Sequence, residues 1–234
     1  MPGPWPDNFA STRAALHALA EHVIAAARYR VDGHISLVPT AGGFGTPLFG
    51  DRERVRVDGV ELVHERPGTT TRVVITTLGA AAQFVGIPLG APTEVYKPAT
   101  ACLPDASLAV DAASARALAD WYAFGADLLD ELRSTYQTRR PSPVVLWPEH
   151  FDLACEIGSE EAQHATYGAS PGDSEIPQPY LYVAPSDVQR RTGRLGTQSF
   201  GAAYTGGELE AATDPRRAGL DFFTECAALL LGEP

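Results

Sequence analysis

Lysine is almost absent from this sequence. The chain has 18 lysine and arginine residues, of which Lys97 alone is a lysine. Chemistry that needs a lysine amine, such as Schiff-base formation, would therefore have to use Lys97. The surrounding segment "EVYKP" (94–98) is proline-rich, so we expect Lys97 to be exposed. Exposure argues against such chemistry, because Schiff-base lysines are activated by burial.

Cysteine is also scarce. Its three positions, Cys102, Cys155 and Cys226, are widely spaced and form no C-x-x-C pair. An odd number at such spacing argues against a disulfide framework and against a cysteine-rich zinc site. The histidine spacings H-x-x-x-H and H-E-x-x-H are missing as well, so we expect neither a metal ion nor another cofactor.

Long apolar runs are missing. No stretch approaches the roughly 20 residues that a membrane-spanning helix needs. The first residues, "MPGPWPDNFAST", lack the basic start and apolar run of a secretory signal. We therefore expect a soluble, cytoplasmic protein that does not bind a membrane.

Positive charge is in deficit. Against the 18 basic residues stand 29 acidic ones, which gives a net charge of -11. Such a chain repels the phosphate backbone, and no lysine or arginine cluster is large enough to offset this repulsion. We therefore expect no nucleic-acid partner.

What the chain does have is apolar and turn-forming residues. Hydrophobic residues make up 44% of the 234 positions, which suffices for one well-packed core. The 22 glycines and 19 prolines indicate many turns. We expect a single domain over 1–234, or two closely packed lobes over 1–110 and 111–234.

The pattern of elements predicts an α+β fold. Apolar residues at helical spacing predict an N-terminal helix over about 12–30, a long central helix over about 111–137, and a C-terminal helix that begins at Asp214-Pro215. Between them we expect antiparallel strands, a hairpin at Asp58-Gly59, a short helix over 78–86, and an extended connection over 87–110. His17 and Glu21 lie one turn apart on the first helix, where we expect an exposed pair.

The stretch "VVLWPEHFDLACEIG" (144–158) places polar residues within a strand-like run. We expect one strand from Val144 to Ile157, with a bulge or edge position at Pro148. Alternation along that strand would point His150 and Asp152 to the same side. An aspartate there can hold an imidazole in one tautomer, as a base and its orienting group. The alternative is an antiparallel strand whose second face is simply solvated.

Two Gly/Pro-rich loops, 42–47 and 168–173, are the other candidates for a site. "GGFGTP" (42–47) lacks the lysine of a phosphate-binding loop, and Ser170 lies outside any G-x-S-x-G pattern. Rigid turns would nevertheless hold Ser170 and Asp173 in place, either to bind a ligand or to brace the structure. Tyr180 and Tyr182 share one face of the next strand. The expected catalytic residues are His150, Asp152 and Asp173, and the expected ligand contacts are Phe44, Tyr167, Ser170, Tyr180 and Tyr182.

Several of these segments resemble a known family. "LWPEHFDLA" (146–154), "YGASPGD" (167–173) and "PQPYLYVAP" (177–185) are similar to an uncharacterised, mainly actinobacterial family of hypothetical proteins, and more distantly to a domain-of-unknown-function family. The resemblance covers most of the chain and implies that its second half matters, but it implies no activity. One departure is "APSD" after Val183, where the family pattern has Gly-Pro.

These observations support two hypotheses from different classes. The first is a soluble protein that binds a small molecule, with or without catalysis, at a polar site on the 150–152 strand and the two loops. The second is a non-catalytic interaction or scaffold protein in which the same residues fix loops to the sheet.

Overall fold

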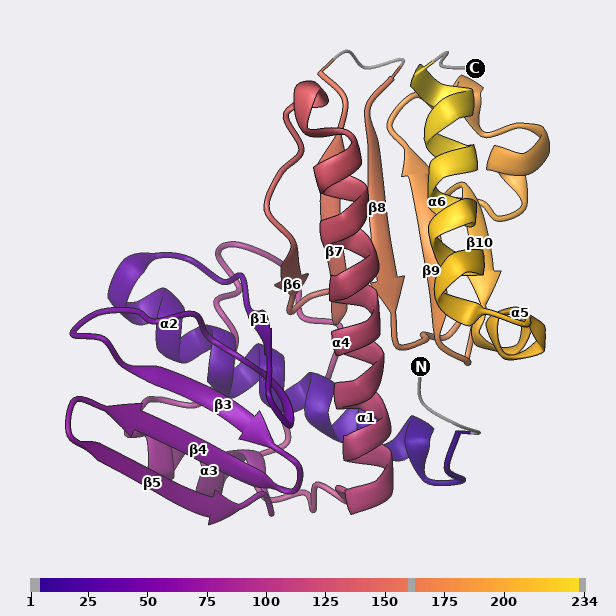
Figure 1. The fold of residues 1–234 in the computed structure, drawn as a ribbon. Coiled ribbons are helices and arrows are strands. Elements are labelled where there is room, and N and C mark those ends of the chain that lie inside the picture. The colour runs from indigo at the N-terminus through magenta and orange to yellow at the C-terminus, as the bar shows by residue number, and fades with distance from the viewer. Residues whose placement is uncertain (1–4, 160–162, 232–234) are drawn as a thin grey trace. The chain divides into compact units, whose positions relative to one another are not determined.

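The chain folds into helices and two separate antiparallel sheets of five strands each (Figure 1). The structure is a computed structural model that describes residues 5–159 and 163–231. Helices near the N-terminus, in the middle and near the C-terminus accompany the sheets, so the predicted α+β class is confirmed. Within these residues no helix has both the length and the apolar character that crossing a lipid bilayer requires.

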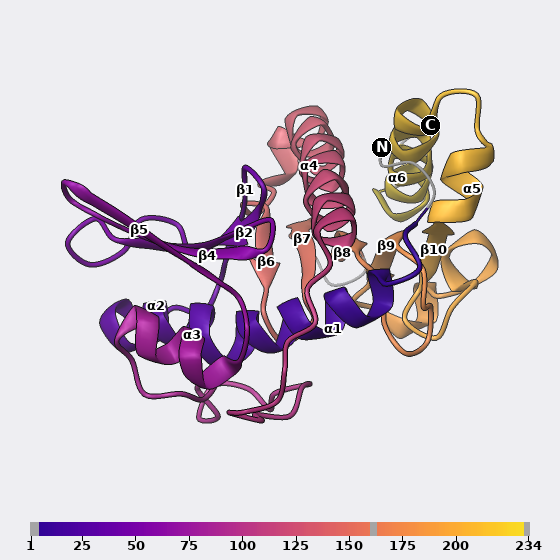
Figure 2. The same ribbon diagram turned by 90° about the horizontal axis from the view of Figure 1, so that it is seen from below.

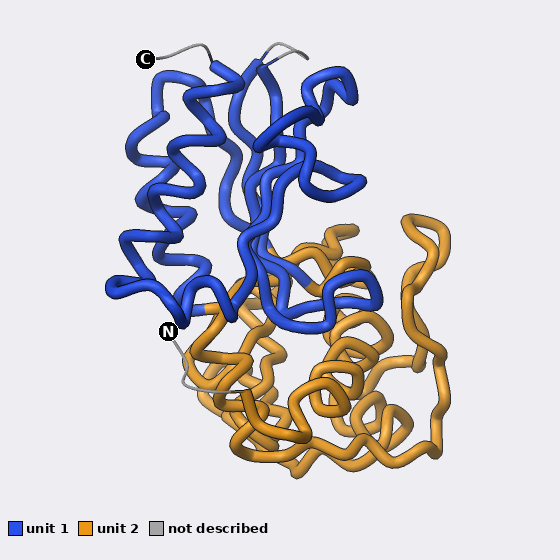
Figure 3. Tube along the Cα trace, turned by 90° about the vertical axis from the view of Figure 1, so that its right-hand side faces the viewer, with its two compact units in different colours: residues 1, 123–145, 152–234 blue, residues 2–122, 146–151 orange. Residues whose placement is uncertain are grey.

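The chain divides into two compact units (Figure 3). The first, here called the N-terminal unit, comprises residues 2–122 and 146–151. The second, the C-terminal unit, comprises residues 123–145 and 152–234. The chain passes from one unit to the other within the long helix and on either side of the segment 146–151. Each unit contains its own sheet.

One long helical segment begins the N-terminal unit. It consists of α1 (Phe9–Leu19), a single π-helical stretch (Ala20–Ile24) and α2 (Ala25–Asp32). The predicted helix is therefore confirmed, and it ends at Gly33, which adopts a left-handed conformation with φ of 75°. Two of the three tryptophans of the chain, Trp5 and Trp121, contact each other edge to face, with ring centroids 5.9 Å apart.

The sheet of the N-terminal unit is a simple antiparallel meander. Its strands follow one another in the order of the sequence, and the tight turn at Asp58-Gly59 is confirmed. Figure 2 shows α2 and α3 on one side of this sheet. The elements are β1 (Val38–Thr40), β2 (Gly43–Gly45), β3 (Arg54–Asp58), β4 (Glu61–Arg66), β5 (Thr69–Val74) and α3 (Leu78–Val85).

The long central helix α4 (Ala112–Thr135) is confirmed, and it is preceded by the expected irregular connection. Residues 87–110 form turns and bends but neither a helix nor a strand. Asp111 caps α4, because its Oδ1 accepts hydrogen bonds from the N–H and the hydroxyl of Ser114, both at 2.8 Å. Such caps satisfy the free N–H groups of a first helical turn.

The C-terminal unit packs helices on one face of its sheet. The strand order is β10-β9-β8-β7-β6, and α6 and the second half of α4 lie over the sheet (Figure 1). The covered face carries Leu153, Ala169 and Leu181, while Asp152, Ser170, Tyr180 and Tyr182 alternate to the other face. The elements are β6 (Val145–Trp147), β7 (Asp152–Ile157), β8 (Ala165–Ser170), β9 (Tyr180–Pro185), β10 (Ala202–Thr205), α5 (Gly206–Ala211), α6 (Pro215–Leu231) and the short helices Gln137–Arg139, Val188–Arg190 and Gly193–Gly196.

The prediction of one strand from Val144 to Ile157 is wrong. A turn over 148–151 separates β6 from β7. Pro148 cannot donate to a strand ladder, and Phe151 adopts a left-handed conformation with φ of 56°. The Phe151 N–H donates to the carbonyl of Trp147 at 2.7 Å, which closes the turn. Strand alternation therefore does not relate His150 to Asp152.

Three further elements differ from expectation. The passage before Pro179 contains a strand, β8, so residues 168–170 of the predicted loop 168–173 are part of the sheet. Residues 43–45 of the predicted loop 42–47 form strand β2, which pairs with both of its neighbours. A short helix, α5, follows β10 and begins with a capping box at Thr205 and Glu208.

Replacement of Gly125 by alanine tests the packing of α4 on the sheet. A Cβ at this position would lie 2.6 Å from the Cβ of Ala169 on β8, so the helix would have to shift outward. We expect Gly125→Ala to lower the free energy of unfolding by about 1–3 kcal/mol, although alanine favours a helix. Chemical denaturation measures this. Gly207→Ala in α5 is the control, because its nearest contact is the flexible end of Gln178 at 3.3 Å. Equal stability of the two variants would contradict the packing.

Candidate functional site

The π-helical stretch of the N-terminal unit buries two polar side chains. The N–H of Ala25 donates to the carbonyl of Ala20, five residues back, which is the mark of a π-turn. Within it, Glu21 has an exposed fraction of 0% and His22 of 2%. Single π-turns inside α-helices are rare and occur frequently at functional sites. The expectation that His17 and Glu21 form an exposed pair is therefore wrong.

The carboxylate of Glu21 is held by donors from a distant part of the chain. Its Oε1 accepts from the N–H of Ala99 at 2.8 Å, and its Oε2 accepts from the N–H of Thr100 at 2.9 Å. The hydroxyl of Thr100 also donates to Oε2. Hydrogen bonds to a carboxylate are about twice as strong as those between neutral groups. Glu21 thus fixes the proline-rich connection against the helix.

His22 fixes a second point of the same connection. Its Nδ1 accepts from the N–H of Ala91 at 3.2 Å, which assigns the proton to Nε2. Nε2 in turn donates to the carbonyl of Thr100 at 3.1 Å. The backbone carbonyl of His22 accepts from the N–H of Gly90 at 3.1 Å. Both nitrogens of the imidazole are therefore used to position residues 90–100.

His17 lies one turn earlier, between Glu21 and the turn 148–151. Its Nε2 is 2.9 Å from the carbonyl of Pro148 and 3.8 Å from Oε2 of Glu21, and its ring stacks on Phe151 at 4.9 Å. Burial lowers the pKa of His17, although Glu21 and the Pro148 carbonyl oppose this effect. Arg13 and His150 lower it further. The imidazole is therefore neutral at pH 7.

Two oxygens of this region have no partner among the residues described. They are Oη of Tyr96 and Oε2 of Glu149, and both atoms are buried although their side chains are half-buried. Burial is the main reason that the pKa of Tyr96 is raised, and the negative charges of Glu21 and Glu149 raise it further. We call His17, Glu21, His22, Tyr96, Thr100 and Glu149 the π-turn cluster. The phenol keeps its proton there and offers one donor.

The C-terminal unit brings together five of the residues that the sequence analysis selected. Tyr180 and Tyr182 share one face of β9, as predicted, and their ring centroids lie 6.1 Å apart. The hydroxyl of Tyr182 donates to Oδ2 of Asp152 at 2.5 Å. Gly168 on the intervening strand allows this, because a Cβ there would lie 2.4 Å from the ring of Tyr182. Burial, followed by Asp152, raises the pKa of Tyr182 well above its ordinary value.

Asp173 and Ser170 brace the loop between β8 and β9. Oδ1 of Asp173 accepts from the N–H groups of Glu175 and Ile176 at 2.7 and 2.8 Å, and Oδ2 accepts from the hydroxyl of Tyr180 at 2.5 Å. The hydroxyl oxygen of Ser170 accepts from the N–H of Gly172 at 3.1 Å. Both oxygens of the Asp173 carboxylate already accept hydrogen bonds, so Asp173 holds its own loop in place.

The remaining predicted residues lie elsewhere. Phe44 is fully buried in the N-terminal unit, against Tyr122 and Phe151. Tyr167 is fully buried on the helix-covered face of the other sheet, 6.1 Å from the ring of Phe223. His150 is exposed, in the turn 148–151. Phe44 and Tyr167 therefore contribute to the cores of their units.

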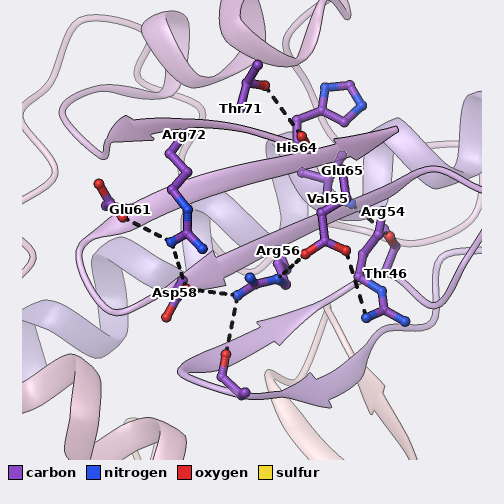
Figure 4. Close-up of polar contacts among 11 residues, drawn as sticks. Thr46, Arg54, Val55, Arg56, Asp58, Glu61, His64, Glu65, Thr71 and Arg72 are labelled. Atoms are coloured by element: carbon purple, nitrogen blue, oxygen red, sulfur yellow. Dashed lines mark hydrogen bonds and ion pairs between the residues drawn. The ribbon is translucent and has the colours of Figure 1, made fainter. Parts of the chain in front are cut away.

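The open face of the first sheet carries a ladder of ion pairs (Figure 4). Arg56 pairs with Glu65 at 2.8 Å and with Asp58 at 3.2 Å. Arg72 pairs with Asp58 at 2.9 Å and with Glu61 at 3.2 Å, and its hydrogen bond is the main reason that the pKa of Asp58 is lowered. Ion pairs at a protein surface contribute little each, about 0–1 kcal/mol. Every charge named here is matched by a partner on its own sheet.

The described residues offer no ready place for a metal ion. No group of three or more histidine, cysteine, aspartate or glutamate side chains in 5–159 and 163–231 is arranged to hold one. Lys97 is exposed, as predicted.

From the sequence, Glu21 was expected only in an exposed pair with His17, and His22, Tyr96 and Thr100 were not expected at a site. The sequence does contain a signal for Glu21 and His22, because all the remaining residues from Ala18 to Ala27 are apolar. A helix that is apolar all round is buried, so polar residues within it are buried too. Nothing comparable marks Tyr96 or Thr100.

Comparison with known proteins gives no further guide. No protein-family model, no curated protein and no solved structure matches the chain. The family resemblance of the motifs at 146–154, 167–173 and 177–185 therefore stays a prediction.

Replacement of Glu21 by glutamine tests the role of the buried carboxylate. The amide would turn a donor toward one of the donors at Ala99 and Thr100, and an N–H of this partly buried site would lose its acceptor. We expect Glu21→Gln to lower the free energy of unfolding by about 2–4 kcal/mol, as measured by urea denaturation. Glu94→Gln is the control, since Glu94 is exposed. A change below about 0.5 kcal/mol, typical of surface sites, would contradict the role of Glu21.

The lowered pKa of His17 predicts a dependence of stability on pH. Below its ordinary pKa of 6.5, the unfolded chain binds a proton at this position more readily than the folded chain. The contribution of neutral His17 is thus complete above that pH and is lost as the pH falls. We expect the wild type to lose more stability than His17→Gln between pH 7.5 and about pH 5 in urea titrations. Parallel profiles of the two proteins would refute this expectation.

Proposed function

We propose that this protein binds a small molecule at the π-turn cluster, through Oη of Tyr96 and Oε2 of Glu149. The observation that supports the proposal is that these two buried oxygens have no hydrogen-bond partner among the described residues. A buried polar atom without a partner costs about 1–3 kcal/mol. A ligand that forms a hydrogen bond with this hydroxyl would offset that cost.

The surroundings of these oxygens suit a binding site. Glu21 and His22 hold residues 90–100 by side-chain hydrogen bonds at Ala91, Ala99 and Thr100. A wall that is already ordered loses little conformational entropy when a ligand binds, which favours affinity. Such preformed sites, with a few polar groups that fix orientation, are typical of small-molecule binding.

The proposed location differs from the one expected from the sequence. The stretch 149–152 still contributes, but through Glu149 in place of His150 and Asp152. Phe44 and Tyr167 lie in the cores, and Asp173 is occupied by its own loop.

The competing proposal is a non-catalytic scaffold protein, and the C-terminal unit favours it. There Asp173 and Ser170 accept hydrogen bonds from their own loop, and Asp152 accepts one from Tyr182, two strands away in the same sheet. On this proposal the polar residues only maintain the fold, and no small molecule binds.

A pair of tyrosine variants separates the two proposals. We expect Tyr96→Phe to weaken binding of small-molecule fragments by about tenfold or more, as one good hydrogen bond in a buried site implies, while thermal stability stays equal or rises. Tyr182→Phe, the matched control, loses its bond to Asp152, and we expect lower stability by about 1–2 kcal/mol with unchanged binding. Saturation-transfer NMR with a fragment library and thermal denaturation provide the two measurements.

The same experiment can fail in two informative ways. If no fragment binds the wild type, or if Tyr96→Phe binds like the wild type, the π-turn cluster is not a binding site. If Tyr182→Phe loses binding and Tyr96→Phe does not, the site belongs to the C-terminal unit.

A further inference from the structure

We infer that the ligand of the π-turn cluster carries a positively charged N–H donor, an ammonium or guanidinium group, and that Glu149 receives it. This inference rests on the proposed function and names the class of ligand. Three features carry it: the charge of the cluster, the hydrogen-bond capacity that is left over, and the arrangement of the carboxylates.

The cluster contains two carboxylates, and neither forms an ion pair with a lysine or arginine of the described residues. The donors to Glu21 are two backbone N–H groups and a hydroxyl, all of them neutral. Among the described residues, the one basic side chain that lies within 4 Å of Glu21 is His17, at 3.8 Å. Burial lowers the pKa of His17 and so keeps its imidazole neutral. Carboxylates that are partly withdrawn from water favour a nearby cation, and they repel an anion such as a phosphate or carboxylate ligand.

The free oxygens call for a donor. Oε2 of Glu149 can only accept when it is ionised, and Oη of Tyr96 can accept as well as donate. An ammonium or guanidinium group carries several N–H donors and can therefore serve more than one such acceptor. A neutral alcohol has a single O–H and can donate to one of them only.

The arrangement favours an organic cation over a metal ion. Both oxygens of Glu21 are already occupied by N–H and O–H donors, which leaves Glu149 as the one carboxylate with a free oxygen. Calcium binds six to eight oxygens, and magnesium takes an octahedral set, usually with one or two carboxylates. The described part of the chain has no group of three suitable side chains here. A cation that brings its own N–H groups needs far fewer ligands.

A set of probes of matched shape tests the inference on the full chain at pH 7. The probes are butylammonium, butylguanidinium, butanol, butyrate and magnesium chloride, each titrated by calorimetry and in thermal-shift assays. We expect the two nitrogen cations to raise the melting temperature and to bind about tenfold or more tighter than butanol, with no response to butyrate.

Glu149→Gln is the decisive variant. We expect it to bind both nitrogen cations about tenfold more weakly, with a melting temperature equal to or above that of the wild type, because it removes a half-buried negative charge that has no ion-pair partner among the described residues. Glu94→Gln is its control, since it removes the same charge from an exposed position two residues from Tyr96. We expect Glu94→Gln to bind like the wild type.

Each other outcome overturns the inference in a recognisable way. Equal binding of butanol or butyrate, or binding that Glu149→Gln does not change, means that the site does not select a cation. A response to magnesium alone means that it is a metal site. If no probe binds, but library fragments bind in a manner sensitive to Tyr96→Phe, the proposed function stands and only the cation inference fails.

Discussion

The N-terminal unit depends on one buried carboxylate. Glu21 lies inside a helix that is closed to solvent, and its two oxygens accept the N–H groups of residues 78 and 79 positions further along the chain. The connection 87–110 forms no helix or strand, so its N–H groups cannot find partners in regular structure. Glu21 and His22 supply partners for four of them, the N–H groups of Gly90, Ala91, Ala99 and Thr100. The π-turn places both side chains on the connection, and the irregular segment becomes part of the fold.

The π-turn cluster contains both fully hydrogen-bonded side chains and polar atoms without a hydrogen-bond partner. Where Glu21 and His22 bond, every donor and acceptor has a partner. In the same unit, Oη of Tyr96 and Oε2 of Glu149 are buried without a hydrogen-bond partner among the described residues. Proteins tolerate such locally unfavourable groups where function requires them, and the surrounding structure compensates for their cost. The contrast with Asp173, whose oxygens all serve its own loop, separates a binding group from a bracing group.

Much of the fold could be predicted from the sequence, because local signals were strong. Periodicity marked α4, Asp58-Gly59 marked a hairpin, Gly86 marked the end of α3, and Asp214-Pro215 marked the start of α6. Other features had no local signal. The left-handed conformation of Phe151 is unusual for a bulky side chain, so the turn that divides β6 from β7 looked like a continuous strand. Strand β8, "ATYGAS", is made largely of small residues with low strand preference.

The candidate site was less predictable, because it depends on contacts between distant residues. The common face of Tyr180 and Tyr182 follows from strand alternation alone and was predicted correctly. The meeting of Glu21 with Thr100 cannot be derived in that way, since neither residue belongs to a motif. Even so, the apolar neighbours of Glu21 and His22 indicated that these side chains are buried. Helical spacing alone placed Glu21 beside the apolar face and led to the wrong prediction that it is exposed.

The distribution of aromatic residues between the units gives each a separate spectroscopic identity. Trp5, Trp121 and Trp147 all belong to the N-terminal unit, and the C-terminal unit contains only tyrosine and phenylalanine. Trp147 is also the last residue of β6, an edge strand of the second sheet, so indole fluorescence excited at the red edge reports on the N-terminal unit and on this strand, whereas circular dichroism in the far ultraviolet weighs the whole chain. Curves from the two methods coincide when the units melt together and separate when they melt in turn. The cooperativity of unfolding between the two units can thus be measured without an added label.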